Sequence, residues 1–236
     1  LPMLNFVDLF SIGDGEEVTI EMLEKYNELK KKGVKREEII KELSKIEGLY
    51  SPKYSKTVTK RGFDLKKEAQ PTRYPVPYSA SVHDRATIEI RRGCGRMCRF
   101  CQAGHVNLPI REIPPEDVID NTLELLSCTG FDEYSLLSLS SNDYENIKDV
   151  IKELAVDFDK KKVSVALPSQ RIDGFNLELA ELTQRVRKST ITLAPEAGSQ
   201  RLRDVVRKNI TSENYEYEVK SNDGLAFNHA KVIALG

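Results

Sequence analysis

The sequence predicts an α/β fold built on parallel strands, and three observations lead to this prediction. From residue 86 onward, short apolar segments of strand length alternate with segments whose apolar residues follow a helical period. Each connection between successive strands is long enough to hold a helix, as right-handed crossovers between parallel strands require. A cluster of cysteines directly follows the first of these strands, and in such folds functional sites gather at the carboxyl ends of the strands.

The strands and helices of this part can be assigned in order along the chain. We expect strands at 86–91, 133–139, 162–167 and 190–194, alternating with helices at 114–128, 143–158, 176–187 and 199–208. The first of these helices opens at Pro114 and Pro115, because proline is tolerated in the first turn of a helix. The series therefore predicts several consecutive β–α units.

The segment before residue 86 has a different character. Residues 4–12 are expected to form a buried strand, followed by helices at 16–32 and 36–46. One strand and two helices are too little to close a core, so we expect residues 1–50 to be the last part of a larger α/β domain. Residues 51–85 hold four prolines and no visible period, and this composition predicts an extended linker.

The composition limits the classes of protein to which the chain can belong. With 39% hydrophobic and 31% charged residues among 236, it is expected to be soluble and globular. No apolar run approaches the roughly 18 residues of a membrane span. The first residues lack the features of a signal peptide, and the few, clustered cysteines indicate a reducing compartment. We therefore expect a cytoplasmic protein with no membrane partner.

The cysteines carry the strongest functional signal. Cys94, Cys98 and Cys101 have the spacing C-x3-C-x2-C, and Cys128 is the one cysteine elsewhere. Three thiolates on one short loop can hold a metal centre and leave a fourth coordination position open, which favours chemistry over a structural role. An alternative is a zinc site in which His105 supplies the fourth ligand of a non-catalytic binding module. Cys128 is expected to be a buried, inert thiol.

The cysteine loop, with Phe100 directly before its last cysteine, resembles the signature of the radical S-adenosylmethionine (radical SAM) superfamily. The resemblance implies an incomplete radical SAM-type partial (β/α) barrel over residues 86–236. It also implies a 4Fe–4S cluster on Cys94, Cys98 and Cys101, whose open iron binds S-adenosylmethionine. One electron, from a donor such as flavodoxin or ferredoxin, would cleave this cofactor to a 5′-deoxyadenosyl radical.

A narrower resemblance covers roughly residues 5–212. The stretches 11–17, 82–85, 135–141, 167–173 and 193–204 are similar to an uncharacterised radical SAM group with a cobalamin-binding-like domain before the barrel. This implies that residues 1–50 are the remnant of that domain and makes cobalamin a weaker candidate cofactor. The sequence after about residue 214 departs from the group's pattern, so we expect a chain truncated at both ends, whose own activity is open.

Position relative to the family suggests four further cofactor-binding residues. Ser140 and Ser141 end the second strand of the barrel, where they would bind the methionine amino group of S-adenosylmethionine. Arg171 would pair with its carboxylate, and Glu196 would accept from its ribose hydroxyls or amino group. The alternatives are that the serines cap a helix and that Arg171 forms a surface ion pair.

Five arginines surround the cysteines, and residues 91–111 contain no acid; the arginines are Arg91, Arg92, Arg96, Arg99 and Arg111. They are expected to compensate the thiolate charge. The alternatives are a solvated basic loop and a contact to the phosphates of an RNA substrate, although the net charge of −1 does not favour RNA. The substrate itself is unknown from the sequence, and by analogy the reaction is a modification of RNA or protein.

Overall fold

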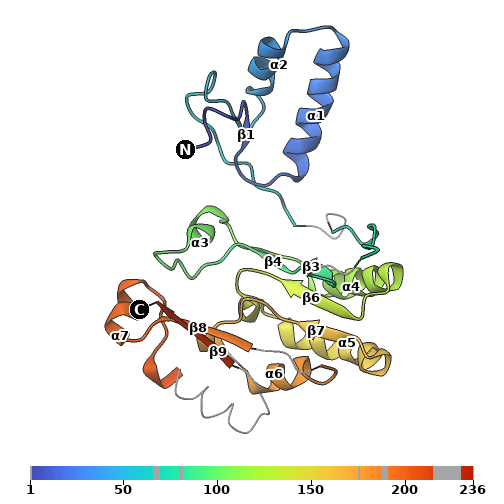
Figure 1. The fold of residues 1–236 in the computed structure, drawn as a ribbon, viewed down its shortest axis with the longest axis vertical. Helices are drawn as coiled ribbons and strands as arrows, with labels where there is room; N and C mark the ends of the chain where they lie inside the picture. Colours follow the sequence, from blue (N-terminus) through green and yellow to red (C-terminus); the bar gives the residue numbers. More distant parts are fainter. Residues whose placement is uncertain are drawn as a thin grey trace. The chain divides into compact units, whose positions relative to one another are not determined.

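The computed structural model describes residues 2–65, 70–79, 82–174, 176–187, 191–214 and 230–235. The chain divides into two compact units, Leu1–Asp64 and Leu65–Gly236, and both combine helices with strands (Figure 1). Among the described residues, no helix has the length and apolar character needed to cross a membrane. The predicted α/β class with parallel strands is confirmed.

The first unit is a pair of helices beside a very short antiparallel pair of strands. The helices are α1 (Glu16–Lys31) and α2 (Arg36–Leu43), and β1 (Phe10–Ser11) pairs with β2 (Leu49–Tyr50). Acidic residues in the first turn of α1 and lysines in its last turn complement the helix dipole. A small core holds the unit together and consists of Val18, Leu29, Ile39, Leu43 and Leu49.

The first unit has a shorter strand than the sequence predicts and includes part of the expected linker. A strand over residues 4–12 is wrong for all but Phe10–Ser11, because the partner strand β2 offers only two residues for pairing. Residues 51–64, expected to belong to a linker, lie in the first unit, where Arg61 forms a backbone bridge with Gly13. The assignment of residues 1–50 to a larger domain stays a prediction.

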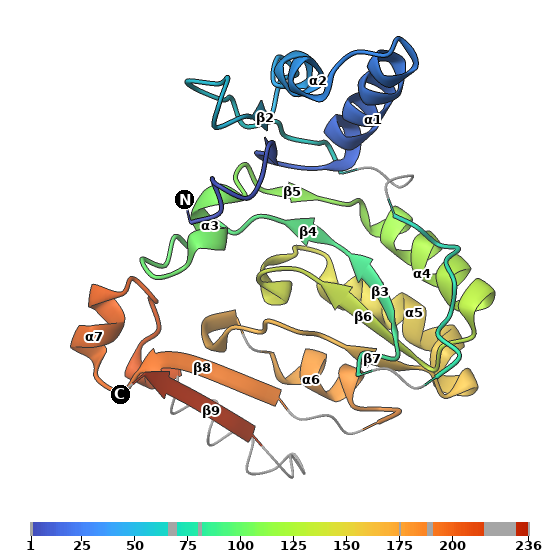
Figure 2. The ribbon, with the colours of Figure 1, turned by 45° about the horizontal axis from the view of Figure 1, so that its top comes forward.

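The second unit contains the predicted series of β–α units. The strands β3 (Ala86–Glu89), β6 (Glu133–Leu137) and β7 (Ser164–Ala166) form a parallel sheet in the order β3-β6-β7. The strand β8 (Ile191–Ala197) pairs in parallel with β9 (Ala230–Leu235). In Figure 2, β3, β6, β7 and β8 are arranged across the unit in the same order as in the sequence. The carboxyl ends of these strands therefore lie on one side of the unit.

Helices follow the strands as the sequence predicts, with shifted ends. They are α4 (Pro115–Thr129), α5 (Ile147–Lys161), α6 (Leu177–Thr183) and α7 (Gln200–Val205). The expected start of a helix at residue 143 is replaced by a 3-10 turn, η2 (Ser141–Asp143), and a second such turn, η3 (Ile172–Gly174), follows β7. Both turns lie after a strand, at the edge where sites are expected.

The core of the second unit lies between the sheet and these helices. Ile88 and Leu136 on neighbouring strands are fully buried, as is Leu154 on α5. The ring of Tyr134 on β6 packs against that of Phe158 on α5, with 5.4 Å between their centroids. Apolar burial of this kind fixes the strand register and so the position of whatever follows each strand.

The predicted strand 86–91 is divided at Ile90. The backbone N–H of Ile90 donates to Leu137 O of β6, whereas its carbonyl accepts from the N–H of Ile113. Beyond this corner, β4 (Arg91–Arg92) pairs antiparallel with β5 (Arg111–Glu112). The two short strands close the base of the loop that carries the cysteines and the short helix α3 (Gln102–Val106).

Candidate functional site

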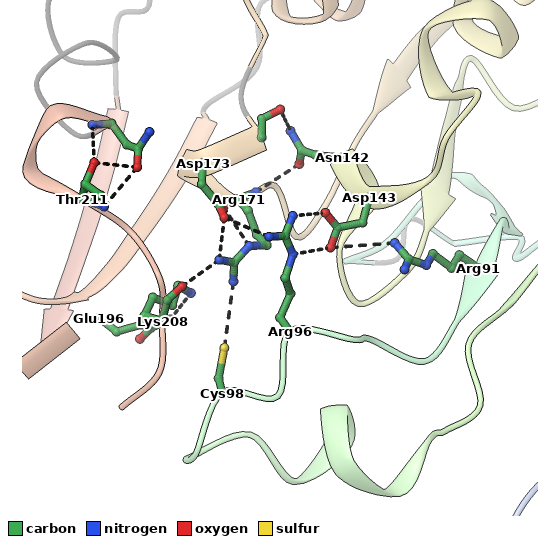
Figure 3. Close-up of polar contacts among 12 residues, drawn as sticks. Arg91, Arg96, Cys98, Asn142, Asp143, Arg171, Asp173, Glu196, Lys208 and Thr211 are labelled. Carbon is green, nitrogen blue, oxygen red and sulfur yellow. Dashed lines mark hydrogen bonds and ion pairs between the residues drawn. The ribbon is translucent and has the colours of Figure 1, made fainter. Parts of the chain in front are cut away.

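The candidate site lies at the carboxyl edge of the strands in the second unit. The cysteine loop follows β3 and β4, the turn η2 follows β6, the turn η3 follows β7, and Glu196 lies near the end of β8. Strands that run parallel bring the segments after them to one edge of the sheet. Figure 3 shows side chains from all four segments: those of the cysteine loop and of the two turns contact one another directly, and Glu196 pairs with Lys208, whose carbonyl meets Arg171.

A tight turn sets the path of the cysteine loop. Gly93 has a φ of 92°, and a Cβ at this position would lie 2.4 Å from Asn107 O, so only glycine fits. Within the loop, Cys101 N–H donates to Cys98 O at 3.0 Å. The sulfur of Cys101 then caps α3 by accepting from Gly104 N–H at 3.4 Å. These bonds hold the backbone around the last two cysteines.

All three cysteines of the motif are free thiols; Cys98 is buried, and Cys94 and Cys101 are half-buried. Among the described residues, no three Cys, His, Asp or Glu side chains converge closely enough to form a ready-made metal site. Thiolates are the donors that iron–sulfur clusters require, and the three share one loop of eight residues. The donor set therefore fits the implied cluster, while the ligand role of each cysteine stays a prediction.

The ring of His105 contacts a main-chain carbonyl. Among the described residues, it does not converge with two other Cys, His, Asp or Glu side chains to form a metal-binding group. Its Nδ1 lies 2.8 Å from Cys101 O. Because a carbonyl oxygen only accepts, Nδ1 carries the proton in this hydrogen bond. The ring is thereby tied to the start of α3.

Arg96, between the first two cysteines, joins the loop to both 3-10 turns. Its Nε donates to Asp143 at 2.9 Å, its Nη2 forms a second, shorter bond to the same carboxylate, and its Nη1 lies 3.1 Å from Asp173. The hydrogen bond to Asp143 raises the pKa of Arg96 against the effect of burial, and the charges of Asp143, Asp173 and Cys94 add to this rise. Burial alone would raise the pKa of Asp143, but the hydrogen bonds from Arg96 and the charges of Arg96 and Arg91 hold it below its usual value. The pair remains charged.

Arg171 lies at the centre of the contacts in Figure 3. It is only 7% exposed, so the alternative of a surface ion pair is wrong. Its Nε and Nη2 donate to Asp173 at 2.8 and 3.0 Å, Nη2 also donates to Lys208 O at 2.8 Å, and Nη1 lies 3.9 Å from Cys98 Sγ. Its predicted pairing with a cofactor carboxylate stays a prediction.

Glu196 forms a buried ion pair with Lys208, whose Nζ lies 2.9 Å from Glu196 Oε1. The backbone is in the left-handed region at Glu196, with a φ of 70°, and at the residues on either side of Lys208, where Arg207 and Asn209 have φ of 55° and 57°. The same Nζ lies 6.0 Å from the centre of the Phe100 ring. Lys208 thus lies between Glu196 and the cysteine loop. The cofactor contact of Glu196 stays a prediction.

The two serines are buried at the end of the β6 segment. Ser141 Oγ donates to Pro168 O at 2.5 Å and accepts from Ser138 Oγ at 3.2 Å, which links the ends of β6 and β7. Ser140 precedes η2 without making a capping hydrogen bond, so the helix-cap alternative is wrong for it. Their cofactor contacts stay predictions.

The five arginines have partners within the protein. Arg91, Arg92 and Arg96 pair with carboxylates outside residues 91–111, and Arg99 and Arg111 donate to main-chain carbonyls. A solvated basic loop is therefore the wrong interpretation for the first three. The absence of acids within residues 91–111 hid this pairing, because the acids come from Glu89, Glu112 and Asp143.

Three site residues were missed from the sequence, namely Asp143, Asp173 and Lys208. The two aspartates follow β6 and β7 by a few residues, and that position was a signal that could have found them. Lys208 carried no such signal, because it follows a helix.

Cys128 is exposed, which contradicts the expected burial. It lies in the last turn of α4, at the edge of the buried face of that helix.

Comparisons with known proteins agree with this arrangement. Residues 88–218 match the family model of the radical SAM superfamily, and residues 1–52 match that of radical SAM proteins, N-terminal. An uncharacterized protein of Methanocaldococcus jannaschii is 28% identical over 213 residues, which cover 89% of this chain and 43% of that protein. A tRNA-2-methylthio-N(6)-dimethylallyladenosine synthase of Desulforamulus reducens is 27% identical over 147 residues, which cover 59% of this chain and 32% of the relative.

Two solved structures share the fold. The radical S-adenosylmethionine methyltransferase TsrM from Kitasatospora setae has a TM-score of 0.62 at 14% identity, with 96% of this chain and 45% of that chain covered. The cobalamin-dependent S-adenosylmethionine radical enzyme OxsB has a TM-score of 0.55 at 17% identity, with 84% and 31% covered. The chain spans less than half the length of each of these relatives. Its sequence, its fold and its cysteine loop together show that the chain belongs to the radical SAM superfamily.

Proposed function

We propose that this chain holds a 4Fe–4S cluster on Cys94, Cys98 and Cys101 and cleaves S-adenosylmethionine reductively. The observation that carries the proposal is the position of three free thiols on one loop at the carboxyl edge of a parallel sheet. Buried polar side chains from three other strand ends lie beside that loop, as a site for a charged cofactor requires. The match to the superfamily over residues 88–218 supports the same chemistry.

When bound, the cluster would pass one electron to the sulfonium of S-adenosylmethionine, whose C5′–S bond would break to give methionine and a 5′-deoxyadenosyl radical. The electron would come from a small reducing protein such as a flavodoxin or ferredoxin. The residues of this chain would bind and orient the cofactor: Ser140 and Ser141 toward the amino group and Glu196 toward the ribose hydroxyls or amino group. Glu196 is already held in place by Lys208.

The substrate class that we propose is RNA or protein. Two relatives are tRNA-2-methylthio-N(6)-dimethylallyladenosine synthases, and these matches support an RNA base as one candidate. Incubation of the reconstituted protein with tRNA, reductant and S-adenosylmethionine, followed by mass spectrometry of the nucleosides, tests this branch. A new modified nucleoside supports it; unchanged tRNA together with a modified peptide would favour the protein branch.

Cobalamin is a weaker proposal for a second cofactor. The fold is shared with an enzyme described as cobalamin-dependent, and residues 1–52 match the N-terminal model of radical SAM proteins. Equilibrium dialysis of the purified chain against hydroxocobalamin provides the test. Saturable binding supports the proposal, and its absence removes cobalamin from the cofactors of this chain.

Anaerobic reconstitution with iron and sulfide tests the main proposal. We expect the visible absorption and the reduced-state EPR signal of a 4Fe–4S cluster, and release of 5′-deoxyadenosine when dithionite and S-adenosylmethionine are added. Cys98→Ala should lose both signals, whereas Cys128→Ala should keep them because Cys128 lies outside the loop and is exposed. A colourless protein that holds one zinc ion per chain would instead support the Cys3His alternative with His105.

A further inference from the structure

Side chains of alternating charge form a continuous network of ion pairs through the site. Starting at β5, the ion pairs and hydrogen bonds run from Glu112 to Arg91, Asp143, Arg96, Asp173 and Arg171. At the other end of this network, Arg171 donates to the sulfur of Cys98 (Figure 3). The network joins β4, β5 and the turns that follow β6 and β7 to the cysteine loop, and most of its members are buried or half-buried.

Hydrogen bonds fix the guanidinium of Arg171 within this network. Two of its nitrogens face the carboxylate of Asp173, a forked arrangement that fixes the plane of the guanidinium. The carbonyl of Lys208 accepts from Nη2 on the other side. These bonds leave Nη1 directed at Cys98 Sγ. A buried guanidinium held in this way is costly to rearrange, because its charge has left water and depends on these partners.

Asp173 is itself fixed by a second arginine. Its Oδ2 accepts from Nη1 of Arg96, which belongs to the cysteine loop. The loop is thus held twice by one carboxylate: directly at Arg96, and through Arg171 at Cys98. Asn142 adds to the frame, because its Oδ1 accepts from the backbone N–H of Arg171 at 3.0 Å.

We propose that Arg171 is a positioning residue that, oriented by Asp173, donates a hydrogen bond to the sulfur of Cys98 and thereby sets the reduction potential of the cluster. The inference rests on the proposed role of Cys98 as a cluster ligand. This role at the ligand sulfur is separate from the predicted pairing of Arg171 with the carboxylate of S-adenosylmethionine.

The physical consequence is an easier reduction of the cluster. A hydrogen bond and a positive charge at a ligating sulfur stabilise the more negative, reduced state, so they raise the reduction potential. The preset guanidinium also fixes the middle ligand before the cluster is inserted, which lowers the cost of ordering the loop. Arg171 should therefore influence both the potential and the order of the cluster-free loop.

The test compares Arg171→Met with Arg99→Met in the reconstituted full chain. Both variants remove one positive charge near Cys98, but Arg99 is exposed and donates to Val205 O. We expect Arg171→Met to have a more negative midpoint potential in an EPR-monitored redox titration, and Arg99→Met to match the wild type. Equal potentials for Arg171→Met and wild type, at equal iron content, would overturn the proposal; so would the same shift in both variants, because charge alone would then explain it.

A second measurement needs no cluster. In the cluster-free protein, hydrogen exchange of the amides in residues 94–104 should be faster in Asp173→Asn and Arg171→Lys than in Arg99→Met. Lysine keeps the charge of Arg171 but cannot reproduce the fork toward Asp173. Unchanged exchange in both variants would contradict the positioning role. If the wild type itself forms no cluster, the proposed function fails, whereas identical potentials in loaded proteins refute this inference alone.

Discussion

At the scale of single residues, the site is a group of buried charges that satisfy one another. Arg96 and Arg171 each meet carboxylates through two or more nitrogens, and Glu196 meets Lys208. Removing one partner from such a group leaves the other charge buried and unpaired, which is the costly outcome. Substitutions in this group should therefore affect stability as well as chemistry.

Asp143 should make the stability of the cluster-free protein depend on pH at the acid end. Its pKa is lowered from the ordinary value of 3.8, so its contribution is complete above that value and is lost as pH falls through the lower pKa of the folded state. Urea unfolding of wild type and Asp143→Asn should differ at neutral pH, and the difference should shrink below about pH 4. A difference that stays constant down to the acid limit would contradict the assignment.

Arg203 is a buried structural residue whose side chain binds five acceptors. They are Ile210 O, Ala197 O, Gly198 O, Gln200 Oε1 and Ser212 Oγ. Lysine has three donors without the planar fork, so Arg203→Lys leaves buried carbonyls unsatisfied and should lower the free energy of unfolding by about 1–3 kcal/mol. The exposed Arg201→Lys is the control. Equal urea midpoints for the two variants would sink this prediction.

At the scale of elements, the turn before the cysteines depends on one glycine. Gly93→Ala places a Cβ against Asn107 O in a left-handed backbone, which should cost about 1–3 kcal/mol and displace the loop. Gly198→Ala is the matched control, because nothing lies within 4 Å of the Cβ added there. Iron content after reconstitution should fall in the first variant only; full loading of Gly93→Ala would show that the turn tolerates a side chain.

The packing of α5 on the sheet should carry much of the stability of the second unit. Leu154 is 1% exposed, and Val156 on the same helix is 65% exposed. Leu154→Ala should therefore lower the free energy of unfolding by about 2–5 kcal/mol, whereas Val156→Ala should change it by about 0.5 kcal/mol or less. Urea denaturation followed by circular dichroism measures both, and similar values for the two would contradict the burial pattern.

At the scale of the whole molecule, the chain consists of two units with cores of different size. The core of Leu1–Asp64 comprises five buried apolar residues on two helices and one short strand. Small units bury a smaller share of their surface, so this one should be the less stable. Hydrogen exchange should show lower protection for the amides of α1 and α2 than for those of β6 and α5. Equal protection would indicate that the chain unfolds as a single cooperative body.

Much of this arrangement was predictable, and the errors have identifiable physical causes. Hydrophobic periodicity located the four strands from Ala86 to Ala197 and the helices between them, because local patterns decide which face of an element is buried. The same periodicity predicted a strand over residues 4–12 that is too long, because the partner strand β2 has only two residues and so limits the length of the pairing. It also missed the corner at Ile90, where the backbone bonds of one residue go to two different neighbours.

The sequence by itself determined the three-cysteine loop, its place after the first parallel strand and the family of the chain. These features are local, because spacing and strand–helix order are written in consecutive residues. Only the tertiary structure decided the charge network, in which Arg96 meets Asp143 and Asp173 and Arg171 meets Cys98. Partners that lie 47 to 77 residues apart along the chain leave no spacing pattern, and only the parallel sheet that aligns the strand ends brings them within hydrogen-bonding distance.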